Sequence, residues 1–202
     1  LWTDSRYFLQ AAQQLKGTEI KLYKEMLPET PSISAFLSTQ LTPGDAVGID
    51  GKMFSAEEVE RMQAELQKCQ IKVKSISDPL DKLWTDRPPM PEAPAFIYET
   101  QYAGKSSIEK IAIIRKELKK CNAKALFLSA LDEIAWTLNL RGNDVHCNPV
   151  LVSYLLIEEN ETHYFIQPQK ITAEVATYMK ETGVNLHTYE EAEAYLSRIS
   201  VE

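Results

Sequence analysis

The chain has 202 residues, of which 44% are hydrophobic and 25% are charged, and its formal net charge is −7. These are ordinary values for a globular protein, and a chain of this length can bury an apolar core in one large domain or in two small ones. The acidic balance argues against a nucleic-acid partner, which requires a concentrated basic surface. No apolar run approaches the roughly 18 residues of a membrane-spanning helix, and no secretion signal is visible.

The cysteines point to a reducing environment. Cys69, Cys121 and Cys147 are odd in number and widely separated, so neither a disulfide framework nor a C-x-x-C pair is present. Cys69 and Cys121 each end an amphipathic helical pattern, where we expect them to be small apolar members of the buried face. We therefore expect a cytoplasmic protein with neither a membrane nor a nucleic acid as partner.

The first 80 residues alternate between helical and extended patterns. Leu1 and Trp2 look like the end of a strand, and Asp4 can cap the helix that follows. Thr30-Pro31 is expected to start another helix, and Ser55-Ala56-Glu57-Glu58 is a capping box ahead of a third. The predicted elements in chain order are a helix over 5–15, a strand over 19–23, a helix from 31, a strand over 46–50, a helix from 56 and a strand over 71–76.

Residues 81–95 are predicted to form a linker. Five prolines lie between positions 79 and 94. Because proline lacks an N–H and has a fixed φ, this stretch suits neither a helix nor an inner strand. Within it, Leu83-Trp84-Thr85-Asp86 has the same letters as Leu1-Trp2-Thr3-Asp4, but the flanking residues differ and we interpret this as coincidence. The predicted domains are therefore residues 1–80 and residues 96–202.

The second half restarts the α/β alternation. Ser106-Ser107-Ile108-Glu109 and Thr188-Tyr189-Glu190-Glu191 are capping boxes, and Asp132 can cap a short helix. Residues 150–157 are almost wholly apolar, as in a central strand, and 162–166 should return as an antiparallel partner. The other predicted elements are strands over 125–128 and 184–186 and helices through 111–121, 134–138, 173–182 and 192–199.

No catalytic constellation is complete. His146, His163 and His187 occur without an H-E-x-x-H motif, and His146 is adjacent to Cys147, which points their side chains apart. Neither a G-x-S-x-G nucleophile motif nor a glycine-rich phosphate motif is present. From the residues we therefore predict no catalytic residue and no metal ligand in this chain.

One unexplained stretch is Asp4-Ser5-Arg6-Tyr7. Arg6 falls in the first turn of the predicted helix, where the macrodipole is positive and a basic side chain is unfavourable. Either Arg6 pairs with Asp4 or another acid, or it reaches outward to a ligand. The residues alone favour the pairing.

The second unexplained stretch covers residues 138–144, between a predicted short helix and a predicted buried strand. Gly142 and Asn143 suit left-handed backbone conformations, and Arg141 can pair with Asp144 or Asp132. We interpret this stretch as a structural corner that holds the loop in place.

Three segments carry a family resemblance. LWTDSRYFLQAAQQL at residue 1, DKLWTDRPPMP in the predicted linker and the 28-residue ALDEIAWTLNLRGNDVHCNPVLVSYLLI at residue 130 closely resemble aminopeptidase P, also called Xaa-Pro aminopeptidase. The match is to the three-domain cytosolic form. It runs in order along essentially the whole chain.

The resemblance implies both a fold and an activity. The chain would comprise two creatinase N-terminal-like (ribonuclease H-like) mixed-sheet units, the first of them incomplete. The family removes an N-terminal residue that precedes proline. Its catalytic "pita-bread" domain, which holds two divalent metals, commonly manganese, through two Asp, one His and two Glu, is absent here. The fragment alone is expected to be inactive and to contain no cofactor, and the family is often dimeric through the absent domain.

The resemblance also assigns one site residue. The arginine of the family's WTD-x-R-Y motif contributes to binding the peptide substrate, and the matching residue is Arg6. This reverses the preference for a purely structural pairing, and Asp4 and Tyr7 are expected to hold the motif in place. At His146 and Cys147 the relatives have an acid and a histidine, so no special role is expected for His146.

The strands that precede the WTDSRY motif in the family are missing, so Leu1 to Asp4 should form an exposed edge. Such an edge is a pairing hazard, and we expect self-association through it or the docking of another molecule along it. Two alternatives remain open. The parent can be a pita-bread relative that has lost catalysis and binds peptides or histones, or the chain can be a free-standing α/β interaction module, which its start in mid-strand argues against.

Overall fold

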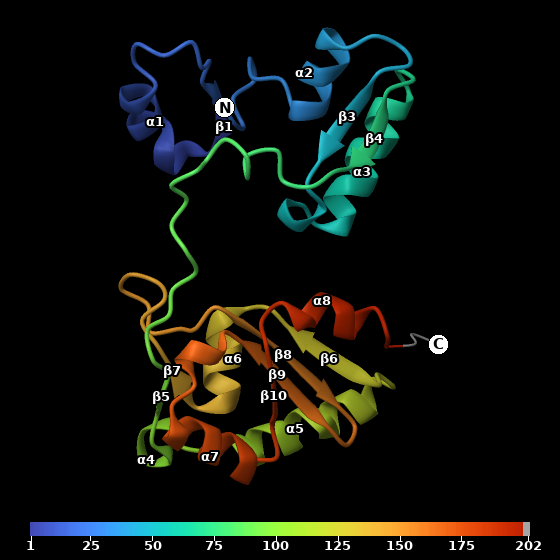
Figure 1. Ribbon diagram of the computed structural model, residues 1–202. Coiled ribbons are helices and arrows are strands. Elements are labelled where there is room, and N and C mark those ends of the chain that lie inside the picture. Colours follow the sequence, from blue (N-terminus) through green and yellow to red (C-terminus); the bar gives the residue numbers. More distant parts are fainter. Residues whose placement is uncertain (200–202) are drawn as a thin grey trace. The chain divides into compact units, whose positions relative to one another are not determined.

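The computed structural model describes residues 1–199, and the chain divides into two compact units, one over Leu1–Arg87 and one from Pro88 onward (Figure 1). The predicted domain limits at residues 80 and 95 stay predictions. None of the helices within residues 1–199 is long and apolar enough to cross a membrane.

The first unit contains two separate parallel strand pairs. Trp2 pairs with Tyr23 across β1 and β2, and Val47 pairs with Val73 across β3 and β4, which α3 connects as a βαβ unit. The elements are β1 Trp2–Thr3, the 3-10 turn Ser5–Tyr7, α1 Phe8–Gln14, β2 Tyr23–Lys24, α2 Ile33–Gln40, β3 Ala46–Ile49, the 3-10 turn Gly51–Met53, α3 Ala56–Gln67 and β4 Lys72–Ser75.

Two small apolar clusters hold the first unit together. In one, the ring of Trp2 stacks on Tyr23 at 4.3 Å between centroids and meets the edge of Phe36 at 5.2 Å. The other joins α3 to β3 and β4 through Ile49, Met62, Leu66 and Ile71. The capping box predicted before α3 is present, because Ser55 and Glu58 bond to each other's backbone N–H.

Several predictions in the first unit were wrong in detail. Helix α2 begins after Ser32 rather than at Thr30-Pro31, because the Ser32 hydroxyl accepts the N–H of Ala35 at 3.1 Å. The strand expected over 19–23 shortens to Tyr23–Lys24, since β1 offers only two residues for pairing. Cys69 is exposed because it lies beyond the last turn of α3, off the buried stripe.

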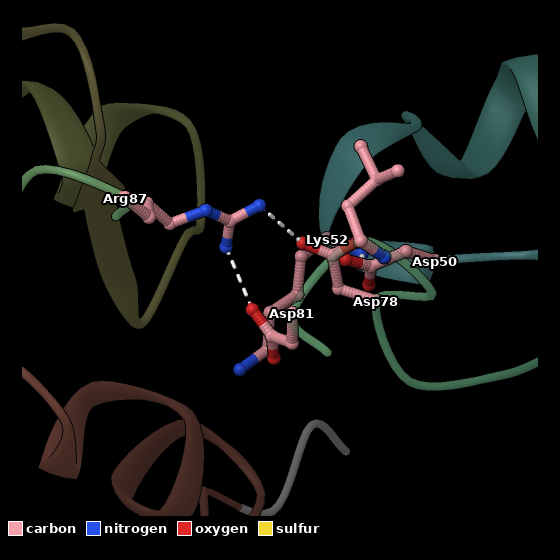
Figure 2. Close-up of polar contacts among 6 residues, drawn as sticks. Asp50, Lys52, Asp78, Asp81 and Arg87 are labelled. Carbon is pink, nitrogen blue, oxygen red and sulfur yellow. Dashed lines mark hydrogen bonds and ion pairs between the residues drawn. The ribbon is translucent and has the colours of Figure 1, made fainter. Parts of the chain in front are cut away.

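The beginning of the proline-rich stretch is folded onto the first unit. Figure 2 shows Arg87 reaching two aspartates, with Nη2 at 2.7 Å from Asp78 Oδ2 and Nη1 at 2.7 Å from Asp81 Oδ1. The Arg87 guanidinium also lies 5.0 Å from the ring of Trp84. These contacts hold the chain up to Arg87 within the first unit.

The second unit is built on a four-stranded mixed sheet in the order β10-β9-β8-β6. Strand β8 runs antiparallel to both β6 and β9, and β10 runs parallel to β9. The elements are β5 Phe96–Ile97, α4 Thr100–Ala103, α5 Ser107–Lys120, β6 Ala125–Leu128, α6 Leu131–Leu138, β7 Leu140–Arg141, β8 Ser153–Glu158, β9 Thr162–Ile166, the 3-10 turn Pro168–Lys170, α7 Ala173–Glu181, β10 Asn185–His187 and α8 Glu191–Leu196.

Helices cover both faces of this sheet (Figure 1). On one face, α5, α6 and α7 enclose the larger core, which includes Leu155, Tyr164 and Met179. On the other face, Leu156 and Phe165 pack against Ala192 of α8. Alternation along β8 and β9 thus sends successive apolar residues to two different cores, and this explains why the middle of each strand is apolar on both faces.

The structure corrects three details of the second unit, namely the cap of α6, the last capping box and the burial of Cys121. Helix α6 is preceded by Ala130 and contains Asp132 in its first turn, where the carboxylate faces the positive end of the macrodipole instead of capping. Only half of the last capping box forms: the Glu191 carboxylate accepts the N–H of Thr188 at 2.7 Å, but α8 starts at Glu191 itself. Cys121 and Cys147 are exposed, Cys121 because it follows the last turn of α5.

Candidate functional site

Arg6 lies in the short 3-10 turn that directly follows β1. Asp4 caps this turn, and its Oδ1 accepts the backbone N–H of Arg6 at 2.9 Å. The same carboxylate accepts the guanidinium Nε at 3.0 Å and Nη2 at 2.8 Å, and the ring of Tyr7 lies 5.7 Å from the guanidinium carbon. Arg6 therefore pairs with Asp4, as the residues alone favoured, while its side chain is still 78% exposed.

The Asp4 pair leaves one part of the guanidinium available. Of the five N–H donors of an arginine side chain, Asp4 accepts two from Arg6, and no acceptor for the others is found among residues 1–199. A guanidinium already oriented by one carboxylate loses little further freedom when it binds a second oxygen ligand. This geometry is compatible with substrate binding by Arg6, which stays a prediction.

The pair will keep Asp4 ionised in acid. Hydrogen bonds from the Arg6 side chain, and then from its backbone, lower the pKa of Asp4 from 3.8 to about 2. The pKa of Asp4 is lower in the folded state than in the unfolded chain, so the pair stabilises the fold. This stabilisation is fully present above pH 3.8 and is lost as the pH falls through about 2. A carbon-13 NMR titration should show this midpoint for Asp4, and Arg6→Ala should return it toward 3.8. An unshifted midpoint in the unsubstituted chain would contradict the pairing.

In the 138–144 corner, the C-terminal end of α6 is buried and capped by side chains. Lys110 Nζ donates to the carbonyl oxygen of Trp136 at 2.7 Å and to Asn139 Oδ1 at 2.6 Å. The hydroxyls of Ser107 and Tyr178 donate to the next two carbonyl oxygens, at 2.9 and 3.2 Å. Burial, followed by the charge of Arg141, lowers the pKa of Lys110. These contacts satisfy carbonyl groups that a helix end leaves without partners.

The backbone of the corner differs from the prediction. Asn139 is left-handed, with φ 51°, whereas neither Gly142 nor Asn143 has a positive φ. Gly142 is required for space instead, since an added Cβ would lie 2.1 Å from Leu151 Cδ2. Because Gly142 has no side chain, the Leu151 side chain can pack directly against the backbone of the corner.

Arg141 pairs with neither of the two aspartates that its sequence neighbourhood offered. Its Nη1 donates to the carbonyl oxygens of Ala135 at 2.5 Å and Leu140 at 2.8 Å. Its guanidinium carbon lies 4.6 Å from the centroid of the Tyr98 ring. Arg141 therefore joins the end of α6 to the segment that follows β5.

Asp144 binds Lys170 instead. The Lys170 ammonium lies 2.5 Å from Asp144 Oδ2, and the N–H of Val152 donates to the same oxygen at 2.6 Å. Both side chains of the ion pair are fully buried, and Asp144 Oδ1 has no hydrogen-bond partner among residues 1–199. The pair ties the corner to the 3-10 turn after β9.

A cluster that the sequence analysis did not anticipate surrounds His163 on the sheet face under α8. His163 Nε2 lies 2.9 Å from Tyr195 Oη, 3.1 Å from Glu158 Oε2 and 3.2 Å from Glu161 Oε2. His163 Nδ1 lies 3.0 Å from His187 Nε2. Burial, followed by the charge of His163, lowers the pKa of His187. The available signal was strand alternation, which places 161 and 163 on one face beside the hairpin partner 158.

This cluster does not fit the two-metal ligand set that the resemblance implies. Within residues 1–199, Glu158, Glu161 and His163 are the only group that brings three potential metal-ligating atoms within 4.8 Å of one another. The group lacks both aspartates and cannot hold two metals through five side chains. We therefore assign no catalytic step to these residues.

Comparisons with known proteins extend these observations. Models of the creatinase/prolidase N-terminal domain match residues 1–83 and 86–202. Aminopeptidase P2 of Arabidopsis thaliana is 36% identical over 94% of this chain and 27% of its own length. Xaa-Pro aminopeptidase ApepP of Drosophila melanogaster is 36% identical over 92% of this chain and 30% of its own length.

A solved structure is similar along nearly the whole chain. It is the crystal structure of X-prolyl aminopeptidase from Caenorhabditis elegans, described as a cytosolic enzyme with a di-nuclear active site. The TM-score is 0.90 at 30% sequence identity, and the match covers 97% of this chain and 32% of that one.

The chain therefore belongs to the creatinase/prolidase N-terminal domain family, and the expected mixed α/β fold of two such units is confirmed. Within this family its relatives are Xaa-Pro aminopeptidases, which confirms the resemblance to aminopeptidase P. The chain spans less than a third of the length of these relatives.

Proposed function

We propose that this chain is a non-catalytic N-terminal part of a metal-dependent Xaa-Pro aminopeptidase, which removes the residue preceding a proline at the second position of a peptide. The observation that carries the proposal is the match of 94% of the chain to an aminopeptidase of which it covers only 27%. The match of both halves of the chain to models of an N-terminal domain supports a role in shaping substrate access rather than in hydrolysis itself.

The same proposal covers the parent enzyme. Two divalent metals, commonly manganese, would be bound by side chains outside this sequence, where they would activate a water and polarise the scissile carbonyl. The parent would act in the cytoplasm as a dimer, on peptides, with neither nucleic acid nor a membrane as partner. The C. elegans relative is described as a cytosolic enzyme with a di-nuclear active site, which supports both the proposed location of the parent and the proposed number of metal ions.

Arg6 is proposed as the residue that this chain contributes to substrate binding. Its guanidinium is exposed, is oriented by Asp4 and keeps N–H donors beyond those that Asp4 accepts. A peptide carboxylate or carbonyl oxygen is the complementary group, because a guanidinium binds such oxygens in a fixed planar geometry.

In the full-length enzyme, Arg6→Ala should lower kcat/KM for an Xaa-Pro peptide by about 10- to 100-fold, because a charge-assisted hydrogen bond to substrate is lost. Steady-state kinetics would be measured together with the metal content, which should not change. Arg61→Ala is the matched control, since Arg61 is exposed on α3, away from the WTDSRY motif, and should leave kcat/KM unaltered.

Two results would overturn this proposal. Turnover of an Xaa-Pro peptide by the purified 202-residue chain would disprove its non-catalytic role. Full activity of the Arg6→Ala enzyme would disprove the role of Arg6 alone. A full-length parent that binds peptides or histones but never cleaves them would favour the alternative, a binding protein that has lost catalysis.

Self-association of the isolated chain is a further part of the proposal. Within residues 1–199, β1 pairs only with β2, so its other edge is open. On β4, the charges of Lys72 and Lys74 oppose pairing of that edge with another chain. On β1, Leu1, Trp2 and Thr3 carry no side-chain charge that would oppose it. Sedimentation velocity should therefore show a concentration-dependent dimer or larger species at micromolar concentration, and a single monomeric boundary throughout would contradict it.

A further inference from the structure

We propose that Glu158, Glu161 and His163 bind one divalent metal ion of the zinc class on the sheet face that α8 covers. His187 would orient the histidine ligand, and Tyr195 would lie beside the fourth coordination position. The site does not depend on the proposed peptidase role, because all five residues belong to the second unit.

The β8–β9 hairpin places the three ligands together. Leu156 of β8 lies opposite His163 of β9, and the turn is closed by a hydrogen bond from the Glu158 N–H to the Glu161 carbonyl oxygen at 2.9 Å. Residues 156 and 158 of β8 share a face with 161 and 163 across the hairpin, since side chains alternate. Both glutamates thus reach the ring that β9 presents on the sheet face against which α8 packs.

The spacing of the donor atoms matches that of a four-coordinate site. Zinc lies about 2.0–2.2 Å from nitrogen and carboxylate ligands, so neighbouring ligand atoms of a tetrahedral site are roughly 3.3 Å apart. His163 Nε2 is 3.1 Å from Glu158 Oε2 and 3.2 Å from Glu161 Oε2. A ring nitrogen combined with carboxylates favours zinc, cobalt or nickel over magnesium or calcium, which prefer oxygen ligands alone.

Charge gives an independent reason for a cation at this point. One ring nitrogen faces two carboxylate oxygens and the Tyr195 hydroxyl, yet an imidazole nitrogen carries at most one proton. The side chain of His163 is only 4% exposed, so water has little access to its ring nitrogen, whereas the Glu158 and Glu161 side chains are 30% and 63% exposed and remain partly hydrated. A metal ion bound to all three side chains removes the repulsion between this nitrogen and the carboxylate oxygens, whereas one proton can bridge only one of the contacts well.

His187 completes the pattern that is found around metal-bound histidines. A ligating histidine donates its other ring N–H to a fixed acceptor, which sets the tautomer and orients the ring. Here His163 Nδ1 lies 3.0 Å from His187 Nε2, and the His187 ring is itself held against Phe165 with centroids 4.9 Å apart. Nε2 of His163 is then the nitrogen with a lone pair for the metal.

The test is zinc binding by the 202-residue chain, measured by isothermal titration calorimetry. The three cysteines are exposed and would bind zinc themselves, so the measurement uses a chain with all three changed to serine. We expect one zinc ion per chain. His163→Ala and Glu161→Gln should each weaken binding at least tenfold, and His187→Ala should weaken it by about tenfold through the loss of orientation.

Two matched controls separate this site from chance binding. His146→Ala removes an exposed histidine outside the cluster, and Glu159→Gln removes the turn glutamate that pairs with Lys119 instead. Neither should change the affinity. Glu161 is exposed, so Glu161→Gln keeps the test valid even if His163→Ala unfolds.

Cobalt supplies the second readout. Co²⁺ at this site should show the intense visible absorption of a four-coordinate ion, and the spectrum should vanish in Glu161→Gln. Equal zinc affinity for the unsubstituted cluster and Glu161→Gln, or no zinc binding at all, would overturn the proposal and leave a proton-bridged hydrogen-bond network. The weak spectrum of an octahedral Co²⁺ ion would contradict the predicted geometry.

Discussion

Replacement of Lys170 by methionine will destabilise the second unit by about 3–5 kcal/mol. The Lys170 ammonium and the Asp144 carboxylate are both fully buried and lie 2.5 Å apart. Methionine fills much of the volume of lysine but leaves the Asp144 charge in the interior with only the Val152 N–H as partner. The large cost is that of an uncompensated buried charge, not the net contribution of the ion pair.

Urea unfolding, followed by hydrogen exchange of the 150–166 segment, would measure this loss in the second unit. The matched control is Lys119→Met, because Lys119 forms an exposed ion pair with Glu159 and should cost less than about 1 kcal/mol. The double variant Asp144→Asn with Lys170→Met removes the stranded charge and should recover part of the loss. A single-variant loss no larger than that of the control would contradict the argument.

The elements that the sequence predicted well are those with local signals. The capping boxes at Ser55 and Ser106 formed as predicted, because each needs only two side chains three residues apart. The antiparallel β8–β9 pair was also predicted, since a short polar turn between two apolar runs leaves few other pairings. The start of α2 was wrong because Thr30-Pro31 and Ser32 offer competing caps within three residues, and only packing selects between them.

In the candidate site too, contacts between residues close in the sequence could be predicted, and contacts between distant residues could not. The Asp4–Arg6 pair could be predicted because its members are two residues apart, and their contact depends on one capped turn. The contact between Asp144 and Lys170 could not, since 26 residues and an entire strand pair separate them. The cluster around His163 was missed for the same reason, because Tyr195 and His187 reach it only after the sheet and α8 have assembled.

The buried end of α6 supports a second stability prediction. Lys110→Met should destabilise the second unit by about 2–4 kcal/mol, because it leaves the buried Asn139 Oδ1 and the part-buried Trp136 carbonyl oxygen without their donor. The ammonium also lies 4.5 Å from the Trp136 ring, an attraction that methionine does not replace. The other end of the Asn139 amide donates through Nδ2 to the Lys105 carbonyl oxygen at 2.9 Å, so turning to find another partner would break this bond.

Lys116→Met on the same helix is the matched control, since Lys116 is exposed and should cost less than about 0.5 kcal/mol. Hydrogen exchange of α6 amides would locate the effect, and the loss in Lys110→Met should be largest in the last turn of that helix. If the two variants were equally stable, the hydrogen bonds from Lys110 would stabilise the fold no more than hydrogen bonds from water to the same acceptors. A loss spread evenly over the second unit, with α6 unaltered, would mean that the lysine fills space rather than capping the helix.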